Sequence, residues 1–404
     1  MGALACAVVD ETAQLSRIRA EWWALLERSG QNQPTLTPLW LEAWWHVFGG
    51  ATLAGGRKLR VVLFRDGDRL VGLAPLCARV HWYRPGLPFR RLELLATGEH
   101  EADETCSEYL GIVAEAGYEE PVAQAFIRTL TSGALGAWDE LVLPAMNGED
   151  RLPPLVTGAL NHAGLPAESL TTSSCPYIAL PASWDAYLKQ LPSSRRYLVN
   201  RSLRDFEKWA AGEAELKTAR TLAELEQGKR VLETLHGERW GHAGHAGVFR
   251  SSRFTAFHDA IMPALLERGA LELSWLSVRG EPVAVLYNFV WSGKVYFYQS
   301  GRRVELPRGI RPGIVVHAYA LKAAIAAGRR EYDFLAGTAQ YKRQLATATR
   351  PLVTVRATHA RVREQARRLT EQALSHVRTL RKRFAAAPPA PKDGDDSDGK
   401  TDSD

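Results

Sequence analysis

Residues 295–337 read VYFYQSGRRVELPRGIRPGIVVHAYALKAAIAAGRREYDFLAG, and this stretch decides the fold class. An apolar β-run leads into a loop rich in glycine and arginine, a helical run follows, and a short β-run closes the stretch. Pro312 suits a helix start, because the N–H that proline lacks would have no partner in the first turn. The stretch therefore predicts a strand, a basic loop, a helix and a second strand.

The loop has the features of an anion site. Gly309 and Gly313 would let the backbone approach a ligand closely, and free N–H groups at a helix start favour phosphate. Arg308 and Arg311 would add charge-assisted contacts to a pyrophosphate. A glycine turn that serves only the fold is the open alternative. The predicted cofactor-binding set is Arg308, Gly309, Ile310, Arg311 and Gly313.

Two hairpins favour a duplicated unit in the chain, with the open alternative that the similarity reflects only features that hairpins share. Apolar runs at 58–65 and 69–80 flank Asp66-Gly67, and runs at 271–278 and 283–291 flank the turn at 279–281. An Asp-Gly pair between alternating apolar runs is a strong hairpin signal. The segments GDRLVGL (67–73) and GEPVAVL (280–286) also resemble each other. Further strands are expected at 91–96, 109–113, 140–143, 295–300, 332–335 and 352–358.

Helices are expected to surround these strands. Residues 11–29 and 37–48 have helical periodicity and are rich in tryptophan, which is typical of a core. The segment 184–269 is mostly helical, and shorter helices are expected at 121–130, 313–327 and 340–345. A basic helix over 359–385 has an apolar stripe that would pack across the body or touch an anionic membrane surface. Residues 386–404 are rich in Pro and Asp and are expected to be disordered.

Composition limits the function classes. The 404 residues carry a net charge of +6, and residues 386–404, with six Asp and two Lys, leave about +10 on residues 1–385. A basic body suits an anionic partner, although the excess of arginine can also serve solubility alone. Four scattered cysteines argue against a disulfide framework, no signal peptide is recognised, and the apolar run at 313–328 is too short and too amphipathic to span a bilayer. We therefore expect a cytoplasmic protein.

The chain resembles a double-domain bacterial branch of the GNAT superfamily of N-acetyltransferases. This branch includes CelD-type proteins of cellulose or exopolysaccharide biosynthesis and is related to the Fem peptidyltransferases. The resemblance covers roughly residues 15–355 and rests on LHGERWG (235–241), YFYQSG (296–301), RPGIVVHAYALKAAIAAG (311–328) and YDFLAGTAQYKRQL (332–345). One departure is that Arg311 stands where the first Gly of the GNAT loop pattern is expected.

The resemblance implies an α+β fold of two tandem GNAT-like domains, each with a mixed, mostly antiparallel sheet flanked by helices. The predicted divisions are 1–170 (degenerate domain), 171–358 (acyl-CoA-binding domain with a helical insertion), 359–385 (basic helix) and 386–404 (tail). The sheet should open between the strands at 295–300 and 332–335, with the thioester in the gap. The acidic stretch 97–107 should repel a pyrophosphate, so only the second half is expected to bind CoA while the first half forms a wall for the acceptor.

The resemblance also implies catalytic roles for three residues. Tyr341 would protonate the departing thiolate, Lys342 would polarise the acyl carbonyl, and Asp333 would act as a base. Each has a structural alternative, namely a packed aromatic residue, a surface charge and a capped carboxylate. The acceptor side is expected to involve His236, Arg239 and Trp240 of the LHxxRW segment, together with Tyr298. His236, His242 and His245 lack an Asp or Cys to complete a metal set, so no metal is expected.

The leading hypothesis is acyl transfer from acetyl-CoA or another acyl-CoA to an amine or hydroxyl, with a small-molecule or glycan acceptor. Polysaccharide-biosynthesis proteins are possible partners under this hypothesis, and DNA is not expected. A Fem-like transferase that uses aminoacyl-tRNA is one alternative, in which arginines of 193–209 would meet RNA phosphates. A non-catalytic scaffold is another alternative. Affinity for CoA separates the first hypothesis from the last.

Overall fold

The computed structural model describes residues 2–50, 56–83, 86–242, 244, 247–337, 339–359 and 362–372. Residues 1–81 and 89–359 form one compact unit, and residues 82–88 and 360–404 form another. In the second unit a helix covers 362–372; Val362 and Leu369 of the predicted apolar stripe are 80% and 67% exposed, whereas Glu364 is buried beside Arg367. The rest of the predicted basic helix and the predicted disordered tail lie outside the described residues.

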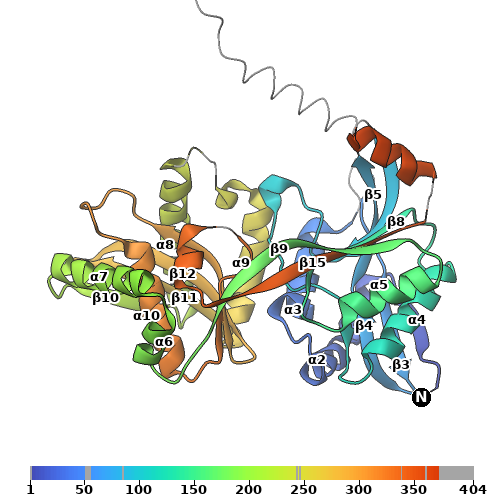
Figure 1. The fold of residues 1–404 in the computed structure, drawn as a ribbon, viewed down its shortest axis with the longest axis horizontal. Coiled ribbons are helices and arrows are strands. Elements are labelled where there is room, and N and C mark those ends of the chain that lie inside the picture. Colours follow the sequence, from blue (N-terminus) through green and yellow to red (C-terminus); the bar gives the residue numbers. More distant parts are fainter. Residues whose placement is uncertain are drawn as a thin grey trace, which may run out of the picture. The chain divides into compact units, whose positions relative to one another are not determined.

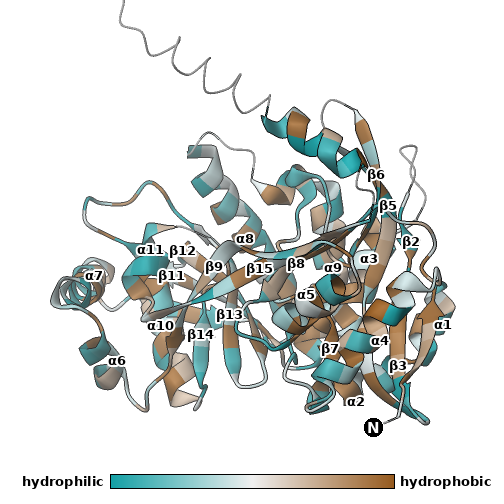
Figure 2. Cartoon of the chain, turned by 45° about the vertical axis from the view of Figure 1, so that its right-hand side comes forward, coloured by the Kyte–Doolittle hydropathy of each residue, from teal (hydrophilic) through white to brown (hydrophobic). Residues whose placement is uncertain are grey.

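In the first half of the large unit, helices and a small antiparallel sheet share one core. The sheet order is β1-β3-β4-β7. Its strands are β1 (Ala5–Val9), β3 (Val61–Asp66), β4 (Arg69–Ala74) and β7 (Val113–Ala114). In Figure 2, β3 is mostly hydrophobic, in agreement with its four buried residues, whereas helix α4 carries both colours. The helices are α1 (Thr12–Arg17), α2 (Arg19–Arg28), α3 (Pro38–Phe48), α4 (Glu119–Thr131) and α5 (Leu152–His162).

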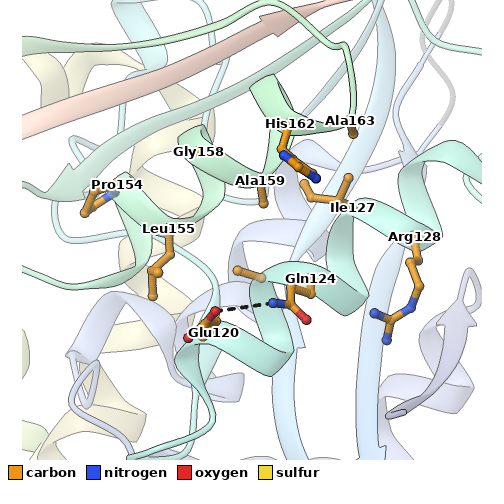
Figure 3. Close-up of a pocket in the computed structure, with 11 residues that line it drawn as sticks. Glu120, Gln124, Ile127, Arg128, Pro154, Leu155, Gly158, Ala159, His162 and Ala163 are labelled. Atoms are coloured by element: carbon orange, nitrogen blue, oxygen red, sulfur yellow. Dashed lines mark hydrogen bonds between the residues drawn. The ribbon is translucent and has the colours of Figure 1, made fainter.

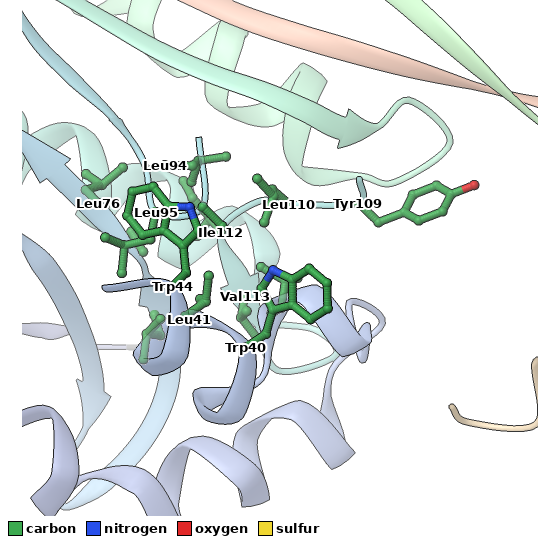
Figure 4. Close-up of a cluster of buried hydrophobic side chains, with 14 of the residues drawn as sticks. Trp40, Leu41, Trp44, Leu76, Leu94, Leu95, Tyr109, Leu110, Ile112 and Val113 are labelled. Atoms are coloured by element: carbon green, nitrogen blue, oxygen red, sulfur yellow. The ribbon is translucent and has the colours of Figure 1, made fainter. Parts of the chain in front are cut away.

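The predicted tryptophan-rich core is confirmed. Trp22, Trp40 and Trp44 are fully buried. Figure 4 shows Trp40 and Trp44 among aliphatic side chains of several strands, while the ring of Tyr109 points away from this cluster. The hydroxyl of Tyr109 reaches Asp333 of the second half instead, at 2.6 Å. The core of the first half and a polar contact with the second half therefore lie side by side.

A second, larger sheet runs through both halves of the chain. Its order among the described residues is β10-β11-β12-β13-β14-β9-β15-β8-β6-β5-β2. The strands are β2 (Lys58–Leu59), β5 (Leu76–Tyr83), β6 (Leu87–Leu94), β8 (Glu140–Asn147), β9 (Ala167–Ala179), β10 (Ala214–Thr218), β11 (Leu271–Val278), β12 (Glu281–Trp291), β13 (Lys294–Arg302), β14 (Glu331–Asp333) and β15 (Ala348–Thr358). Most neighbouring pairs are antiparallel, so the predicted α+β class with mixed, mostly antiparallel sheets is confirmed.

The long antiparallel pair β9 and β15 joins the halves (Figure 1). One end of β9 pairs with β14 of the second half, and β15 pairs with β8 of the first half. The boundary predicted between residues 170 and 171 lies inside β9. Because AESLTTSSCPYIA is polar and largely exposed, its sequence lacks the alternating apolar pattern by which strands are recognised.

The helices of the second half lie on both faces of its sheet. They are α6 (Trp184–Gln190), α7 (Ser193–Ala210), α8 (Leu222–His242), α9 (Ser252–Glu267), α10 (Pro312–Ala326) and α11 (Gln340–Leu345). Buried residues of α6, α7 and α10 share one core with strand residues such as Phe297. Those of α8 and α9 join the core of the first half, together with Tyr296 and Tyr298. Successive residues of β13 thus face two different cores.

Two predicted strands need correction, and strands β1, β9 and β10 were not predicted. The run 69–80 is divided at Pro75 into β4 and β5, which belong to different sheets. Only Val113 of the predicted strand 109–113 is in a strand, because Tyr109 has a left-handed backbone with φ of +58°. Strand β10 was not predicted within the helical segment. None of the described helices is both long and apolar enough to span a membrane.

Candidate active site

The sheet of the second half opens between the two strands that the family resemblance implied. Strands β13 and β14 pair in parallel through Lys294–Glu331, Val295–Tyr332 and Tyr296–Asp333, and no further. The register between β12 and β13 shifts where Asn288 and Tyr287 pair with Phe297 and Gln299, so β13 carries one extra residue there. Beyond Asp333 the chain turns to β9, where the Phe334 N–H donates to the Pro176 carbonyl at 2.9 Å. The two strands therefore leave a gap between them.

A pocket of about 430 Å³ adjoins the open end of this gap. The end of β13, the first turns of α10, the short helix α11 and Arg239 of α8 form its walls. The lining residues are Arg239, Leu286, Ser300, Gly301, Arg302, Ile310, Arg311, Pro312, Gly313, Ile314, Val316, His317, Gln340, Tyr341 and Gln344. Gly301 is required here, because a Cβ would lie 2.5 Å from the backbone nitrogen of His236 on α8.

The pocket is positively charged. Arg239, Arg302 and Arg311 line it, and none of the lining residues is acidic. Burial and the nearby Arg239 guanidinium lower the pKa of Arg302, which is the effect expected of cations held together without a counter-ion. The start of α10 adds its N-terminal dipole at the same wall. The arrangement can hold an anionic group such as a phosphate.

The structure places part of the predicted cofactor loop in this pocket. Ile310, Arg311 and Gly313 line it, whereas Arg308 and Gly309 are exposed and do not. Gly309 has φ of +94°, so glycine serves the turn of the loop at this position. Ser300 and Arg302 on β13 were not predicted. Both residues lie at the end of β13, directly before the predicted loop. The sequence analysis treated this segment only as a strand and did not consider its side chains as ligand-binding residues.

Tyr341 and Lys342 are neighbours on α11, but they point to different surroundings. Tyr341 lines the pocket, stacks on His317 at 5.4 Å and has the Arg239 guanidinium 5.9 Å from its ring centre. Burial raises the pKa of its phenol, so the hydroxyl keeps its proton at neutral pH. Lys342 is buried and donates from Nζ to the Ala336 carbonyl at 2.6 Å. Burial lowers the pKa of this lysine.

Asp333 does not line the pocket. It is fully buried, and its Oδ2 accepts hydrogen bonds from the Tyr109 hydroxyl at 2.6 Å and from Arg350 Nη1 at 3.1 Å. Its Oδ1 accepts from the Leu335 N–H at 2.7 Å. Burial raises the pKa of Asp333 to about 6, although these hydrogen bonds favour its carboxylate. Because both oxygens have partners, the geometry matches the structural alternative for this residue.

The predicted acceptor residues separate into two groups. Arg239 lines the pocket and donates from Nη1 to the Ser300 hydroxyl at 3.0 Å. His236 is buried 5.0 Å from the Phe249 ring and 5.8 Å from Trp240. Tyr298 is buried on the side of the first half, where its hydroxyl donates to the Thr105 carbonyl at 2.6 Å. His245 lies outside the described residues, and within the described part of the chain no cluster of three or more metal-ligating side chains occurs.

One acidic residue of the first half that the sequence did not single out contacts the segment that follows β14. Glu108 accepts at Oε1 from the Ala336 N–H at 3.2 Å, next to the carbonyl that Lys342 contacts. Burial raises its pKa to about 8, although the Lys342 ammonium lowers it. No local signal marked Glu108, because the acidic stretch 97–107 ends one residue before it and was treated only as a region that repels phosphate.

A larger pocket, of about 580 Å³, lies between α4 and α5 of the first half (Figure 3). It contains none of the residues that the sequence singled out. Glu120 and Gln124 at its edge are hydrogen-bonded to each other at 3.3 Å. Because the smaller pocket combines the gap, a helix start and three cations, we take the smaller one as the candidate active site.

Comparison with known proteins shows which domain contains this pocket. Residues 193–343 match the family model described as "Acetyltransferase (GNAT) domain", and this range includes every lining residue of the smaller pocket except Gln344. The solved structure of FemX superposes with a TM-score of 0.58 at 12% identity, over 86% of this chain and 98% of FemX. A tandem GNAT protein from the clavulanic acid biosynthesis pathway gives a TM-score of 0.43 at 12% identity, over 87% of this chain and 98% of that protein.

Among curated proteins, an S-adenosylmethionine synthase from Parasynechococcus marenigrum (strain WH8102) is 24% identical over 180 residues. The aligned part is 41% of this chain and 40% of that protein, so the chain spans about two fifths of the length of this relative. That extent is too short to transfer an activity. FemX shows which overall fold the chain has, and the family model shows which domain contains the pocket.

Proposed function

We propose that this chain, whose residues 193–343 match a GNAT acetyltransferase domain, transfers an acyl group from acetyl-CoA or another acyl-CoA to an amine or hydroxyl acceptor. The observation that carries the proposal is the cationic pocket beside the open strands β13 and β14. Acyl-CoA carries phosphates at one end and the reacting thioester at the other. A site for acyl-CoA must therefore combine an anion-binding wall for the phosphates with a gap that admits the narrow part of the molecule that ends in the thioester.

The chain's own residues fit both parts. Arg302, Arg311 and the start of α10 would bind phosphate, because charge-assisted hydrogen bonds to phosphate are stronger than neutral ones. The neutral phenol of Tyr341 lies at the same pocket and would give its proton to the departing thiolate. In the reaction, the acceptor atom bonds to the carbonyl carbon while the carbon–sulfur bond breaks. No metal is required for this chemistry.

A donor other than acyl-CoA is the alternative, because the chain shares its fold with FemX. In that case the exposed arginines Arg201 and Arg204 on α7 would contact RNA phosphates of an aminoacyl-tRNA. Strong RNA affinity with a steep salt dependence would favour it over the acyl-CoA proposal. The cytoplasmic location and a role in polysaccharide biosynthesis stay predictions from the sequence.

Calorimetric titration of acetyl-CoA and of free CoA tests the proposal. We expect measurable binding that the double variant Arg302→Ala/Arg311→Ala weakens at least about tenfold, equivalent to about 1.4 kcal/mol. The matched control is Arg303→Ala, because Arg303 neighbours Arg302 but pairs with Glu281 at 3.1 Å and does not line the pocket. Absence of binding to both nucleotides contradicts the proposal. Equal losses in the double variant and the control would contradict the location of the phosphates.

A further inference from the structure

The helix at 362–372, dark red in Figure 1, exposes its apolar side. Val362, Ala366 and Leu369 lie at positions i, i+4 and i+7, so they share one side of the helix, and all three are exposed. Glu364 is turned about 200° from Val362 on the same helix and is buried. An exposed apolar side opposite a buried carboxylate is the reverse of the arrangement that folding in water favours.

The opposite side of this helix is held against the ends of strands β5 and β6. Glu364 Oε1 accepts from Arg367 Nη2 at 2.7 Å. The Arg367 guanidinium lies 5.2 Å from the ring centre of Tyr83, and Arg363 Nη1 donates to the Pro88 carbonyl at 3.5 Å. These contacts fix which side of the helix faces the protein. The apolar side is therefore directed away from the strands.

The small unit, residues 82–88 and 360–404, has a large share of the exposed apolar side chains. Among the described residues eight large apolar side chains are exposed, and Trp82, Val362 and Leu369 of the small unit are three of them. Trp82, near the end of β5, is 59% exposed. Tryptophan is enriched at membrane–water interfaces, because its ring combines an apolar body with a polar N–H.

Positive charge accompanies this apolar surface. The side chains of Arg363 and Arg368 are exposed on the described helix. Between residues 359 and 385 the sequence contains eight Lys and Arg and only two Glu. In the same range the apolar positions continue at helical spacing through Ala373, Val377, Leu380 and Phe384. An apolar stripe with arginines beside it is the pattern of a helix that lies in the plane of a membrane interface.

We propose that the small unit binds the surface of an anionic phospholipid bilayer. Trp82, Val362 and Leu369 insert among the acyl chains, and the arginines beside them contact the lipid phosphates while their aliphatic stems stay next to the stripe. This surface contains no residue of the candidate active site, so the inference goes beyond the proposed acyl transfer and does not depend on it.

An anionic bilayer fits both properties of the surface at once. The apolar side chains leave water, and each Lys or Arg close to anionic lipid strengthens binding about fivefold. RNA would pair with the arginines and leave the apolar stripe in water. A second copy of the chain would cover the stripe but bring two positively charged segments together.

Sedimentation of the full chain with vesicles tests the proposal. One set of vesicles contains equal parts of phosphatidylserine and phosphatidylcholine, and the other contains phosphatidylcholine alone. We expect binding to the anionic vesicles that is at least about tenfold stronger than binding to the neutral ones. Raising NaCl from about 0.1 M to about 0.5 M should weaken it about tenfold, because salt screens the attraction of the arginines to the lipid.

A pair of matched variants isolates the apolar side of the helix. Val362→Gln/Leu369→Gln should weaken vesicle binding at least about tenfold, because it removes two inserted side chains, changes no charge and keeps good helix formers. The control is Leu170→Gln/Leu222→Gln, which removes two apolar side chains of the large unit that are 53% and 64% exposed. The control should bind vesicles like the wild type, and both variants should keep the wild-type unfolding temperature.

A charge variant completes the set. Arg381→Gln/Lys382→Gln/Arg383→Gln should weaken binding to the anionic vesicles at least about tenfold and leave the weak binding to neutral vesicles unchanged. Acetyl-CoA binding serves as a separate measurement. Its absence would overturn the proposed function alone, because the candidate active site lies in the large unit.

Three results would overturn the lipid surface. The first is no binding to anionic vesicles at low salt, and the second is an equal loss in Val362→Gln/Leu369→Gln and in its control. The third is a dimer, measured by light scattering, that Val362→Gln/Leu369→Gln dissociates while vesicle binding stays unchanged. That result would assign the apolar side to a second copy of the chain.

Discussion

Two regions of the second half contain arginines whose partners differ. In the pocket, Arg239, Arg302 and Arg311 gather without an acidic side chain among the lining residues. At the junction of the halves, Arg350 on β15 is 7% exposed and donates to Glu331, Asp333 and Glu149. The guanidinium group is the same in both places, and its partners differ.

This difference separates binding from structure. A buried cation with three carboxylate partners is already satisfied, so it can offer nothing to a ligand. Cations that are close together and lack a counter-ion are in a less favourable state, which an anionic ligand relieves. Substitutions in the two regions should therefore affect different measurements, stability for the junction and binding or rate for the pocket.

The largest effect is expected from Arg350→Met. The variant removes the guanidinium that is bonded to Glu331 at 3.0 Å and to Asp333 at 3.1 Å, and both carboxylates stay buried. Glu331 keeps its ion pair with Lys294 at 2.9 Å, whereas Asp333 keeps only neutral donors. Breaking a buried ion pair in this way costs about 3–5 kcal/mol. Urea unfolding measures the loss, and Arg303→Met, with its exposed partner Glu281, should lose less than about 1 kcal/mol. Equal losses in the two variants would remove the contrast between the regions.

A smaller effect on rate is expected from Tyr341→Phe. The ring packs on His317 and beside Phe297, so phenylalanine keeps the contacts and loses only the hydroxyl. If Tyr341 protonates the thiolate, kcat should fall about 10- to 100-fold while the Kd for acetyl-CoA stays within about twofold. Steady-state rates and calorimetry measure the two quantities. A rate that does not change would leave Tyr341 as a packing residue.

Local sequence patterns predicted the local structure of the site well. The helix at 340–345 has the same bounds as α11, and the hairpin turn follows Asp66. Each depends on neighbours in the sequence, such as turn residues, alternation and a proline at a helix start. The opening of the sheet between the two expected strands was implied by the family resemblance instead. The cationic pocket itself was predicted only in part, since Arg311 and Arg239 were named and Arg302 was not.

The junction could not be predicted because its contacts join distant parts of the chain. Tyr109 and Asp333 are 224 positions apart, and the pair β9 and β15 joins strands whose polar sequences lack a clear pattern. Asp333 was considered as a base because the sequence places an acidic residue in a strand beside the expected gap. Its partners Tyr109 and Arg350 are far away in the sequence and are recognised only in the three-dimensional structure. Glu108 escaped notice for the same reason: nothing near it in the sequence indicates that it is buried.

The smallest effect concerns Glu108, where stability should depend on pH. Burial raises its pKa to about 8 in the folded chain, well above the value of an exposed glutamate. A raised pKa means that folding takes up a proton, so this contribution to stability is complete below the unfolded pKa and is lost as pH rises through about 8. This pKa already includes the effect of the Lys342 ammonium, which favours the carboxylate, so we expect a loss on the order of 1 kcal/mol for each pH unit just below 8.

Glu108→Gln has no proton to lose at this position. Its unfolding temperature should therefore match or fall below that of the wild-type protein at pH 6 and gain on it by about 2 °C at pH 9. Thermal scans of both proteins at the two pH values measure the change, and Glu120→Gln should follow the wild type at both. A constant difference between the Glu108→Gln variant and the wild-type protein would mean that Glu108 is ionised throughout. The carboxylate would then be held by Lys342 as a structural pair, like the pairs of Arg350.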